Sequence, residues 1–496
     1  MATQIQFRRG TASAHSVFTG AIGEVTYDTT LNTIRVHNSA QMGGFALATR
    51  DFVTSSIVSG ASFGDGLTST SGQIVIDNTI ARVSALGSYS VTLSGGITSQ
   101  SLSQKLGEII SVKDFGALGD NSTDDSDAIQ AALSFVSARN GGQLFIPNGN
   151  YFISKKLTYK GNNLNLTGES RGVSKIITSY NSGNVIELGD GAKTYVNNQI
   201  SNLTISSISA RTAGVSLYCQ NQFKFLVHNI SFDRPHTAMH FKQCTLGTIK
   251  DFEAQTPTAT SGMGIIVSGG NDQYFRDGII AGTPLDKYGV GFLIRNTGAT
   301  WVDNVGCLLG TNGMALQPVS GNSIEWLFVT NCAWDSGLGR GLVVEPLGGT
   351  VKGCSFTQCW TSSFDLEGIY VNYSAGSVDG LRFSQHRSFN NGRAGVSVLK
   401  GTNFRFHDGE ITGNSRESFG IYHGVEFAPG VSGMSIQGCR IGSGNGFPAT
   451  QGYNLLINNG DSNNYILTGN DLRGFLIAAF SDSGSGPNKI AANNIS

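Results

Sequence analysis

The chain is poor in proline and in charged residues, and it contains no long apolar run. Only 9 of the 496 residues are proline, 14% are charged, and the net charge is -1. A near-neutral chain lacks the basic surface of a protein that binds nucleic acid or an anionic membrane. No segment has the length of a transmembrane helix, and the N-terminus, MATQIQFRRGTASAHSVF, lacks the apolar core of a secretory signal. We therefore expect neither nucleic-acid binding nor membrane insertion.

Cysteine is scarce and unpaired in its spacing. There are seven cysteines, and Cys354 and Cys359 are too far apart for the CxxC pair of a zinc site. This favours buried free thiols in a protein made in a reducing cytosol, and it predicts no metal or other cofactor. Glycine, by contrast, is abundant at 67 residues, which indicates many short strands joined by tight turns.

One phrase recurs from Gly214 onward: a small residue, an alternating apolar strand, and a turn rich in glycine or asparagine. Copies include GVSLYCQN at Gly214, GFLIRNTG at Gly291 and GIYVNYSAG at Gly368, and successive copies start 22 to 29 residues apart. A strand-sized unit at this interval buries its apolar face only by stacking on its neighbours. The leucine and asparagine ladder of a leucine-rich repeat is missing. The pattern predicts an all-β, right-handed parallel β-helix of about ten or eleven coils.

Alternation along each strand assigns a direction to the side chains. The residues one and three places after the starting glycine point inward, and the residue two places after points outward. This outward residue is apolar in four successive coils, at Ile266, Leu293, Ala315 and Val343. An outward apolar stripe on a solenoid predicts a covering partner, and we expect a homotrimer of side-by-side helices to cover it.

Residues 1–50 read as a small β module and residues 51–108 as a stalk or linker rich in Ser, Gly and Thr. The module contains FRRGT, then GEVTYDT, then RVHN, and in this order it resembles the N-terminal segment of many bacteriophage tail fibre and tail spike proteins. The resemblance implies attachment to phage tail or adaptor proteins. It also implies a place in the tail of the virion after synthesis in the cytoplasm of the bacterial host.

The segment SVKDFGALGDNSTDDSDAIQAALSFVSARNGGQLFIPNGNYFIS resembles the opening segment of the pectate-lyase-like β-helix superfamily, a fold common in phage tail spikes. We expect residues 109–160 to form this opening and capping segment, residues 198–496 the repeating coils, and residues 109–496 one β-helix. Asp125 is a candidate N-cap for a helix from Ser126 to Ala138 that plugs the end of the solenoid. The closing glutamate of a calcium loop and the GxxxxGK[ST] of a phosphate loop are missing, so the acids here are expected to be structural.

The resemblance implies recognition, and often cleavage, of a bacterial surface polysaccharide, but the shared opening segment carries no catalytic residues to transfer. Hydrolysis of a glycosidic bond needs two carboxylates, one acting as acid and one as base or nucleophile. Our first choice of pair comes from Asp335, Asp365 and Glu367, and our second is Asp408 with Glu410. The competing interpretation is that these acids form ordinary surface ion pairs.

Sugar binding also requires exposed aromatic rings and planar hydrogen-bonding groups, which gather in the same middle coils. Trp360, Arg387 and Glu410 are predicted to stack in one outward column, one residue per coil. The candidate substrate-binding residues are Trp334, Glu345, Trp360, Tyr370 and Arg387.

We therefore predict a phage tail spike that binds and depolymerises a host capsule or lipopolysaccharide by glycosidic bond cleavage. A first alternative is a non-enzymatic adhesin of the same fold, because binding needs only the aromatic and polar groups. A second is a polysaccharide lyase, which would use a basic residue such as Arg295, Arg387 or Lys400 to handle a proton. Three copies per spike would add avidity for a polymer.

Overall fold

The computed structural model describes residues 8–47, 105, 107–255, 261–460 and 462–496, and the backbone of four short strands between residues 67 and 101. The chain divides into two compact units, Met1–Glu108 and Ile109–Ser496. Most of the expected stalk lies outside the described residues. Its described strands form two hairpins: β5 (Leu67–Thr70) with β6 (Gln73–Ile76), and β7 (Ser90–Val91) with β8 (Gln100–Ser101). In the described part of the chain, no helix is both long and apolar enough to cross a membrane.

The N-terminal unit contains a small four-stranded sheet with one short helix. The elements are β1 (Arg8–Gly10), α1 (Ala12–Ser16), β2 (Val25–Asp28), β3 (Thr33–Val36) and β4 (Phe45–Ala46). The strands lie in the order β1-β2-β3-β4, with β1 parallel to β2 and the other pairs antiparallel. The described part of the first fifty residues therefore forms a four-stranded sheet, in agreement with the β module expected there.

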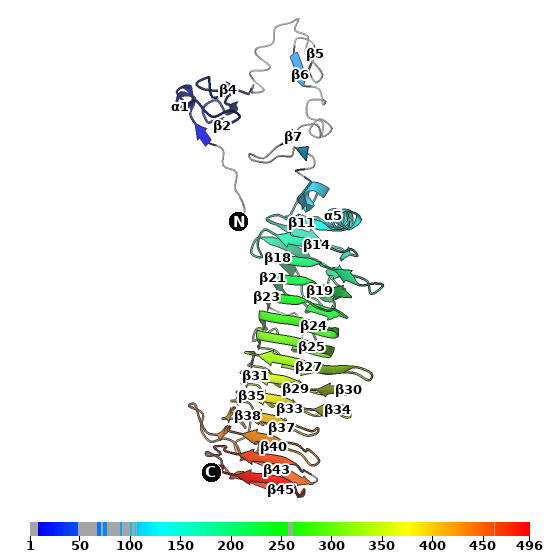
Figure 1. Cartoon of the computed structure of the whole chain (residues 1–496), viewed down its shortest axis with the longest axis vertical. Helices are drawn as coiled ribbons and strands as arrows, with labels where there is room; N and C mark the ends of the chain where they lie inside the picture. The colour runs from blue at the N-terminus through cyan, green and yellow to red at the C-terminus, as the bar shows by residue number, and fades with distance from the viewer. Residues whose placement is uncertain are drawn as a thin grey trace. The chain divides into compact units, whose positions relative to one another are not determined.

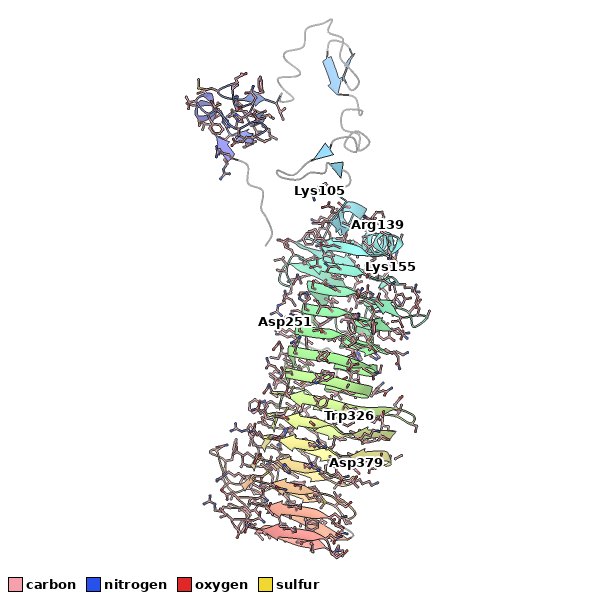
Figure 2. The ribbon with its side chains drawn as sticks, in the orientation of Figure 1. Lys105, Arg139, Lys155, Asp251, Trp326 and Asp379 are labelled. Atoms are coloured by element: carbon pink, nitrogen blue, oxygen red, sulfur yellow. The ribbon has the colours of Figure 1, made fainter. Side chains whose placement is uncertain are left out.

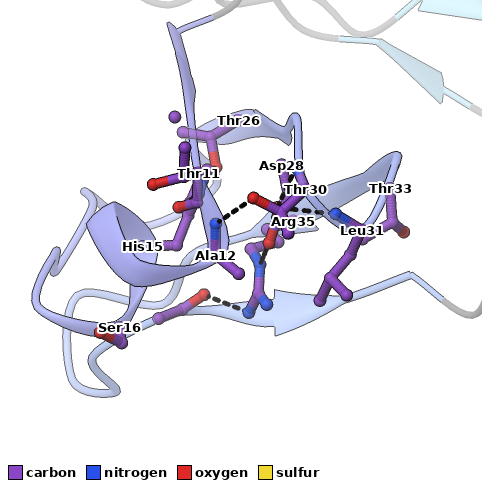
Figure 3. Close-up of polar contacts among 12 residues, drawn as sticks. Thr11, Ala12, His15, Ser16, Thr26, Asp28, Thr30, Leu31, Thr33 and Arg35 are labelled. Carbon is purple, nitrogen blue, oxygen red and sulfur yellow. Dashed lines mark hydrogen bonds and ion pairs between the residues drawn. The ribbon is translucent and has the colours of Figure 1, made fainter.

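The centre of this module is polar rather than apolar (Figure 3). The buried Thr26 hydroxyl lies 2.9 Å from Nε2 of His15 and 2.9 Å from Nε2 of His37. Asp28 is fully buried and accepts a hydrogen bond from Nε of Arg35 at 2.9 Å. Buried polar groups are stable only when they are paired, so this network takes the place of part of an apolar core.

The second unit opens with β9 (Ile110–Ser111), the 3₁₀ turn η1 (Val112–Phe115), β10 (Asp120–Asp124) and α5 (Ser126–Ala138). The helix has the bounds that the sequence predicts. Its buried apolar stripe consists of Ile129, Ala132, Leu133 and Val136. This stripe packs against β11 (Gly142–Ile146) and β13 (Leu157–Tyr159), so α5 lies against the N-terminal end of the solenoid (Figure 1).

The expected role of Asp125 as a side-chain N-cap is wrong. Its carboxylate accepts the backbone N–H groups of Leu118 at 2.7 Å and Gly119 at 3.0 Å, and it makes no cap bond to the helix. Asp124 instead accepts the backbone N–H of Ser126 at 3.0 Å. Asp125 is buried, and its carboxylate is therefore paired with these two amides of the preceding loop rather than with the helix.

The solenoid is a continuous array of 36 strands that forms three parallel ladders (Figure 1). Ladder 1 contains β13, β16 (Ile186–Leu188), β19 (Val215–Gln220), β22 (Thr237–Lys242), β26 (Asn312–Leu316), β29 (Leu342–Val344), β33 (Ile369–Val371), β37 (Val396–Val398), β40 (Val425–Phe427), β43 (Tyr453–Gly460) and β45 (Ala478–Gly484). Ladder 2 contains β11, β14 (Leu164–Gly168), β27 (Ser323–Thr330), β31 (Ser355–Thr357), β35 (Arg382–Ser384), β38 (Arg405–His407), β41 (Ser435–Gln437), β44 (Tyr465–Thr468) and β46 (Lys489–Ala492). Ladder 3 contains β12 (Gly149–Ile153), β15 (Ser174–Thr178), β28 (Ala333–Asp335), β32 (Trp360–Ser362), β36 (Arg387–Phe389), β39 (Glu410–Thr412) and β42 (Arg440–Gly442).

Long strands carry the chain from one ladder to the next. Those that join ladders 2 and 3 are β18 (Gln199–Ser207), β21 (Leu226–Asp233) and β23 (Thr248–Gln255), and those that cross all three are β24 (Met263–Ala281) and β25 (Val290–Leu308). Two short pairs lie beside the ladders: β17 (Tyr195–Val196) with β20 (Gln222–Phe223), and β30 (Leu347–Lys352) with β34 (Ala375–Asp379).

The solenoid is longer than the repeat predicts. It has about 14 turns, against the expected ten or eleven. The additional turns lie before Gly214, where β11 to β16 already pair in the three-ladder register. The ladder 1 strands of these first coils are not preceded by glycine: Lys156 precedes β13 and Val185 precedes β16. The repeated phrase therefore does not reveal them.

The apolar stripe predicted on the outside of ladder 1 is already covered within the chain. Leu293 and Ala315 are each 1% exposed and Val343 is 5% exposed. With Val290 they form a second apolar cluster outside the main core. Ile266, the fourth residue of the stripe, is partly buried against this cluster. The stripe is therefore largely covered within the chain and does not by itself support a trimer. The seven cysteines, in contrast, are buried and free, as expected.

Candidate functional site

The corner between ladders 2 and 3 is built by polar residues with positive φ. In successive coils these are Asn202, Asn229, Asp251, Asp277, Asn304 and Asn331, with φ between 50° and 58°. Asparagine and aspartate adopt this left-handed conformation more readily than other residues with a side chain. The side chains also bond from coil to coil: Asn229 donates to Asn202 at 2.8 Å, and Asn304 donates to Asp277 at 2.9 Å.

An open groove of about 960 Å³ follows this corner, and we call it the corner groove. Its lining includes the six corner residues, and its far end is formed by Trp360. On ladder 3 the outward positions between Ile279 and Trp360 are occupied by Gly306 and Ala333, whose small side chains leave the surface hollow. From Asn202 to Asn331 the groove advances five coils, or about 24 Å at about 4.8 Å per coil.

The groove has both polar and apolar walls, with acidic groups in neighbouring coils. Asp251, Glu253 and Asp277 line it, with Arg171 and His228 among the remaining lining residues. Burial lowers the pKa of His228, and the nearby Lys250 lowers it further. Figure 2 labels Asp251 at the edge of the solenoid opposite Trp326 and Asp379. Such a surface offers closely spaced donors and acceptors to the hydroxyl groups of a sugar polymer.

The predicted outward column of Trp360, Arg387 and Glu410 is confirmed by the strand register. Trp360 pairs with Arg387, and Arg387 pairs with Glu410, in adjacent strands of ladder 3. Trp360 is 37% exposed, and its ring centroid lies 5.5 Å from that of Phe389. Nε of Arg387 lies 3.5 Å from Oε2 of Glu410. Because Trp360 also closes the corner groove, the column extends the polar surface toward the C-terminus.

Glu367 lies elsewhere, in the loop that leads from ladder 3 to ladder 1. Its carboxylate accepts Nε of Arg340 at 2.6 Å and lies 4.0 Å from Nη1 of Arg393. The Arg340 guanidinium lies over the Tyr370 ring at 3.9 Å from the centroid, a cation–π contact. The Glu367 side chain is only 10% exposed. Two arginines therefore lie within ion-pair distance of this largely buried carboxylate.

Glu426 is the acidic residue that the sequence analysis missed. It lies on β40 in the outward column that contains Tyr370 and Ser397. Burial raises the pKa of its carboxyl, and the charge of Glu367 raises it further, whereas a 2.5 Å hydrogen bond from the Ser397 hydroxyl opposes the shift. Its signal was the phrase GVEFAPG, where a glutamate occupies the outward place that is apolar in four earlier copies, from Ile266 to Val343. We call Glu367, Glu426, Arg340, Arg393 and Tyr370 the Glu367 cluster.

Asp335 and Asp365, the other two acids predicted as catalytic alongside Glu367, each bond to a different group. Asp335 ends β28 and accepts hydrogen bonds from Ser362 at 2.6 Å and Ser336 at 3.1 Å. Asp365 is exposed and lies 3.5 Å from Nη2 of Arg416. Asp335, Asp365 and Glu367 thus each bond to a different partner.

The remaining candidates occupy two further positions. Asp408 is exposed at the corner, with a φ of 53°, two residues before Glu410. Glu345 follows β29 and accepts a hydrogen bond from Nε2 of Gln317 at 3.0 Å. Glu410 lies in the outward column two strands beyond Trp360, outside the lining of the corner groove. Glu345 follows a strand of ladder 1, the ladder that also contains Tyr370.

Trp334 is wrongly predicted as a sugar-binding residue. It is 1% exposed and its ring packs against Phe356, with centroids 6.2 Å apart. Alternation explains the error, because Ala333 points outward and its neighbour must point inward. Trp334 is a core residue.

Each of the two units contains a segment that matches a known protein family. Residues 109–332 match the family described as rhamnogalacturonase A/epimerase, pectate lyase-like, and residues 5–38 match the major tropism determinant N-terminal domain. A tail fiber receptor-binding protein of Bordetella phage BPP-1 is 48% identical over 58 residues, which is 12% of this chain and 15% of that protein. Alginate lyase 7 of Azotobacter vinelandii is 36% identical over 114 residues, 21% of this chain and 13% of the lyase.

The chain thus spans less than a sixth of the length of these two curated relatives. Among solved structures, tailspike protein 3 of bacteriophage CBA120 aligns with a TM-score of 0.57 at 13% identity, covering 98% of this chain and 76% of that one. At this identity the likeness concerns the fold. Residues 109–332, which match the pectate-lyase-like model, lie within a right-handed parallel β-helix, and the match to the tropism-determinant N-terminal domain lies in the N-terminal unit.

Proposed function

We propose that this chain is a phage tail spike that binds a surface polysaccharide of the host bacterium in the corner groove. The observation that supports this most directly is the groove itself, which crosses successive coils and ends at the exposed ring of Trp360. A long open groove with polar groups in its walls suits a polymer, and an aromatic ring suits the apolar face of a sugar.

The N-terminal segment supports a place in the virion tail. Its likeness to a phage receptor-binding protein is confined to 58 residues, so it concerns how the protein is carried rather than what it recognises. We propose that this module joins tail or adaptor proteins after synthesis in the host cytoplasm. A homotrimer would present three grooves to one polymer and raise the effective affinity.

Cleavage is the finer part of the proposal, and we assign it to Glu367 and Glu426. These acids lie outside the corner groove, so the groove would anchor the polymer while another stretch of the same polymer is cut at the Glu367 cluster. Glu426, with its raised pKa, would donate a proton to the leaving glycosidic oxygen. Glu367, which contacts Arg340 at 2.6 Å and Arg393 at 4.0 Å, would take a proton from the attacking water. Asp335, Asp365, Asp408 and Glu410 stay as weaker candidates.

An adhesin without cleavage is the second candidate. The observation that favours it is the close contact of Glu367 with Arg340 at 2.6 Å, which also fits a purely structural ion pair. In that case the corner groove and Trp360 would bind the polymer without cutting it. Tyr370, Arg387 and Glu345 would then contribute at most to binding.

One incubation separates these functions. The purified chain is mixed with surface polysaccharide of the host strain, and polymer size, new reducing ends and unsaturated uronate absorbance are followed together. Shortening with reducing ends alone supports hydrolysis, and we expect Glu367→Gln and Glu426→Gln to abolish it. Glu325→Gln, in a surface pair with Lys352 at 3.0 Å, is the matched control. Unsaturated products would indicate a lyase, binding without shortening an adhesin, and the absence of binding would contradict the proposal.

A further inference from the structure

A group of large apolar side chains is exposed near the C-terminal end of the solenoid. Phe419 is 63% exposed, Ile421 61%, Leu476 50% and Ile477 55%, and the neighbouring Phe475 is 38% exposed. They lie on two of three successive loops that lead from ladder 3 to ladder 1, at residues 413–424 and 471–477. We call these five residues the C-terminal patch.

The patch is held together by its backbone. The N–H of Gly420 donates to Thr450 O at 2.8 Å, and the N–H of Leu476 donates to Gln451 O at 2.9 Å, so the three loops stack. A Cβ placed on Gly420 would lie 3.5 Å from Cδ1 of Leu476, which therefore covers this glycine. The side chains are thus presented on a preformed surface, and little conformational entropy would be lost when they are covered.

The patch is large enough to be the centre of an interface. With roughly 150–200 Å² for each large side chain, the exposed fractions leave on the order of 400–500 Å² of apolar surface. That is at the upper end of what a monomer exposes, where such patches are often functional. It is also about half of the roughly 800 Å² that each partner buries in a standard interface.

The surrounding charges indicate which partner fits. Arg416 lies 3.5 Å from Asp365, Nε of Arg393 lies 2.9 Å from Glu417, and Nη2 of Arg473 lies 2.8 Å from Asp471. These cations are neutralised within the chain, whereas a surface that binds anionic lipid presents cations to the lipid. Phe419 and Phe475 present aromatic rings, but no side chain of the patch offers a hydrogen bond to the hydroxyl groups of a sugar. A near-neutral apolar surface with a paired rim suits another copy of this chain, whose net charge is -1.

We propose that the C-terminal patch is the surface on which copies of this chain pack together. The same loops also support the Glu367 cluster: Glu417 bonds Arg393, and the guanidinium of Arg393 lies 5.4 Å from the Tyr422 ring centroid. A neighbouring subunit on the patch therefore stands beside this cluster and forms part of its wall. This inference rests on the assembly part of the proposed function, and it is independent of whether the polymer is cut.

The test measures oligomeric state and polysaccharide binding separately. Sedimentation velocity of the full chain is compared with that of the double variant Phe419→Ser/Ile421→Ser and of the single variant Ile477→Lys. Leu285→Ser is the matched control, because Leu285 is 93% exposed and lies outside the patch. Because all these side chains are exposed, folding is expected to be unaffected, and circular dichroism checks this for each variant.

We expect the wild-type chain and Leu285→Ser to be oligomeric, and both patch variants to shift toward monomer with at least a tenfold weaker association. Per-subunit binding of short polysaccharide fragments should stay within twofold, which separates this result from a failure of the groove. A monomeric wild type at micromolar concentration, or patch variants that stay oligomeric, would overturn the proposal. Flotation of the wild type, but not of the patch variants, with anionic vesicles would do the same, because the partner would then be lipid.

Discussion

Two tryptophans show how the direction of a single side chain decides its role. Trp334 and Trp360 occupy adjacent coils of ladder 3, but Trp334 faces the core at 1% exposure and Trp360 faces the corner groove at 37%. The register pairs Trp360 with Ala333, so the two tryptophans differ by one place along the strand. Since side chains alternate between the faces of a strand, one place is enough to exchange a core residue for a binding residue.

We predict opposite effects of truncating the two rings. Trp334→Ala should lower the free energy of unfolding by about 3–5 kcal/mol, because it leaves a cavity in a packed core. Trp360→Ala should change stability by less than about 1 kcal/mol and weaken polysaccharide binding. Chemical denaturation and binding titrations of both variants measure this. A stable Trp334→Ala variant with lost binding would contradict the assignment.

The pH dependence of depolymerisation tests Glu426 as the acid. A raised pKa keeps this carboxyl protonated to a higher pH, so activity that needs its proton is present below that pKa and is lost as the pH rises through it. The Ser397 hydroxyl stabilises the ionised form, so Ser397→Ala should move the alkaline limb of the pH–rate profile to higher pH. Ser377→Ala, at an exposed serine outside the cluster, should leave the profile unchanged.

At the scale of elements, the corner and the loops contain the polar and charged residues of the candidate sites, whereas the strands supply the apolar core. The corner depends on residues that tolerate a positive φ, and the loops between ladders 3 and 1 carry Glu367, Glu417 and the C-terminal patch. The last loops are tied to the coils by ion pairs. Asp471 lies 3.0 Å from Nη1 of Arg440 and 2.8 Å from Nη2 of Arg473.

This ion-pair network predicts an acid-sensitive C-terminal end. Arg473, together with Arg440, lowers the pKa of Asp471 to about 2 against the opposing effect of burial. The stabilisation is complete above the unfolded pKa of about 4 and is lost as the pH falls toward 2. Asp471→Asn should remove about 1–2 kcal/mol of stability at pH 7 and little at pH 2, as measured by urea denaturation at both pH values. Asp286→Asn, at an exposed site, should show no such difference.

At the scale of the whole molecule, the length of the corner groove predicts a dependence on ligand length. Affinity for defined polysaccharide fragments should rise until the fragment spans about 24 Å and then level off, because longer chains gain no further contact with one groove. Calorimetric titration with a fragment series measures this. Trp360→Ala should lower the affinity of the longest fragments most, and an affinity independent of length would argue for a smaller site.

The sequence by itself determined the architecture, because a repeated strand with period-2 alternation can bury its apolar face only by stacking. It also predicted α5 at its observed bounds and the column of Trp360, Arg387 and Glu410, since both depend on local spacing. Tertiary structure alone decided the rest. It covered the stripe at Leu293, buried Trp334, formed the corner groove from small residues in separate coils, and brought Glu426 within the electrostatic reach of Glu367. These outcomes depend on loop lengths and on contacts between coils, which no single stretch of sequence specifies.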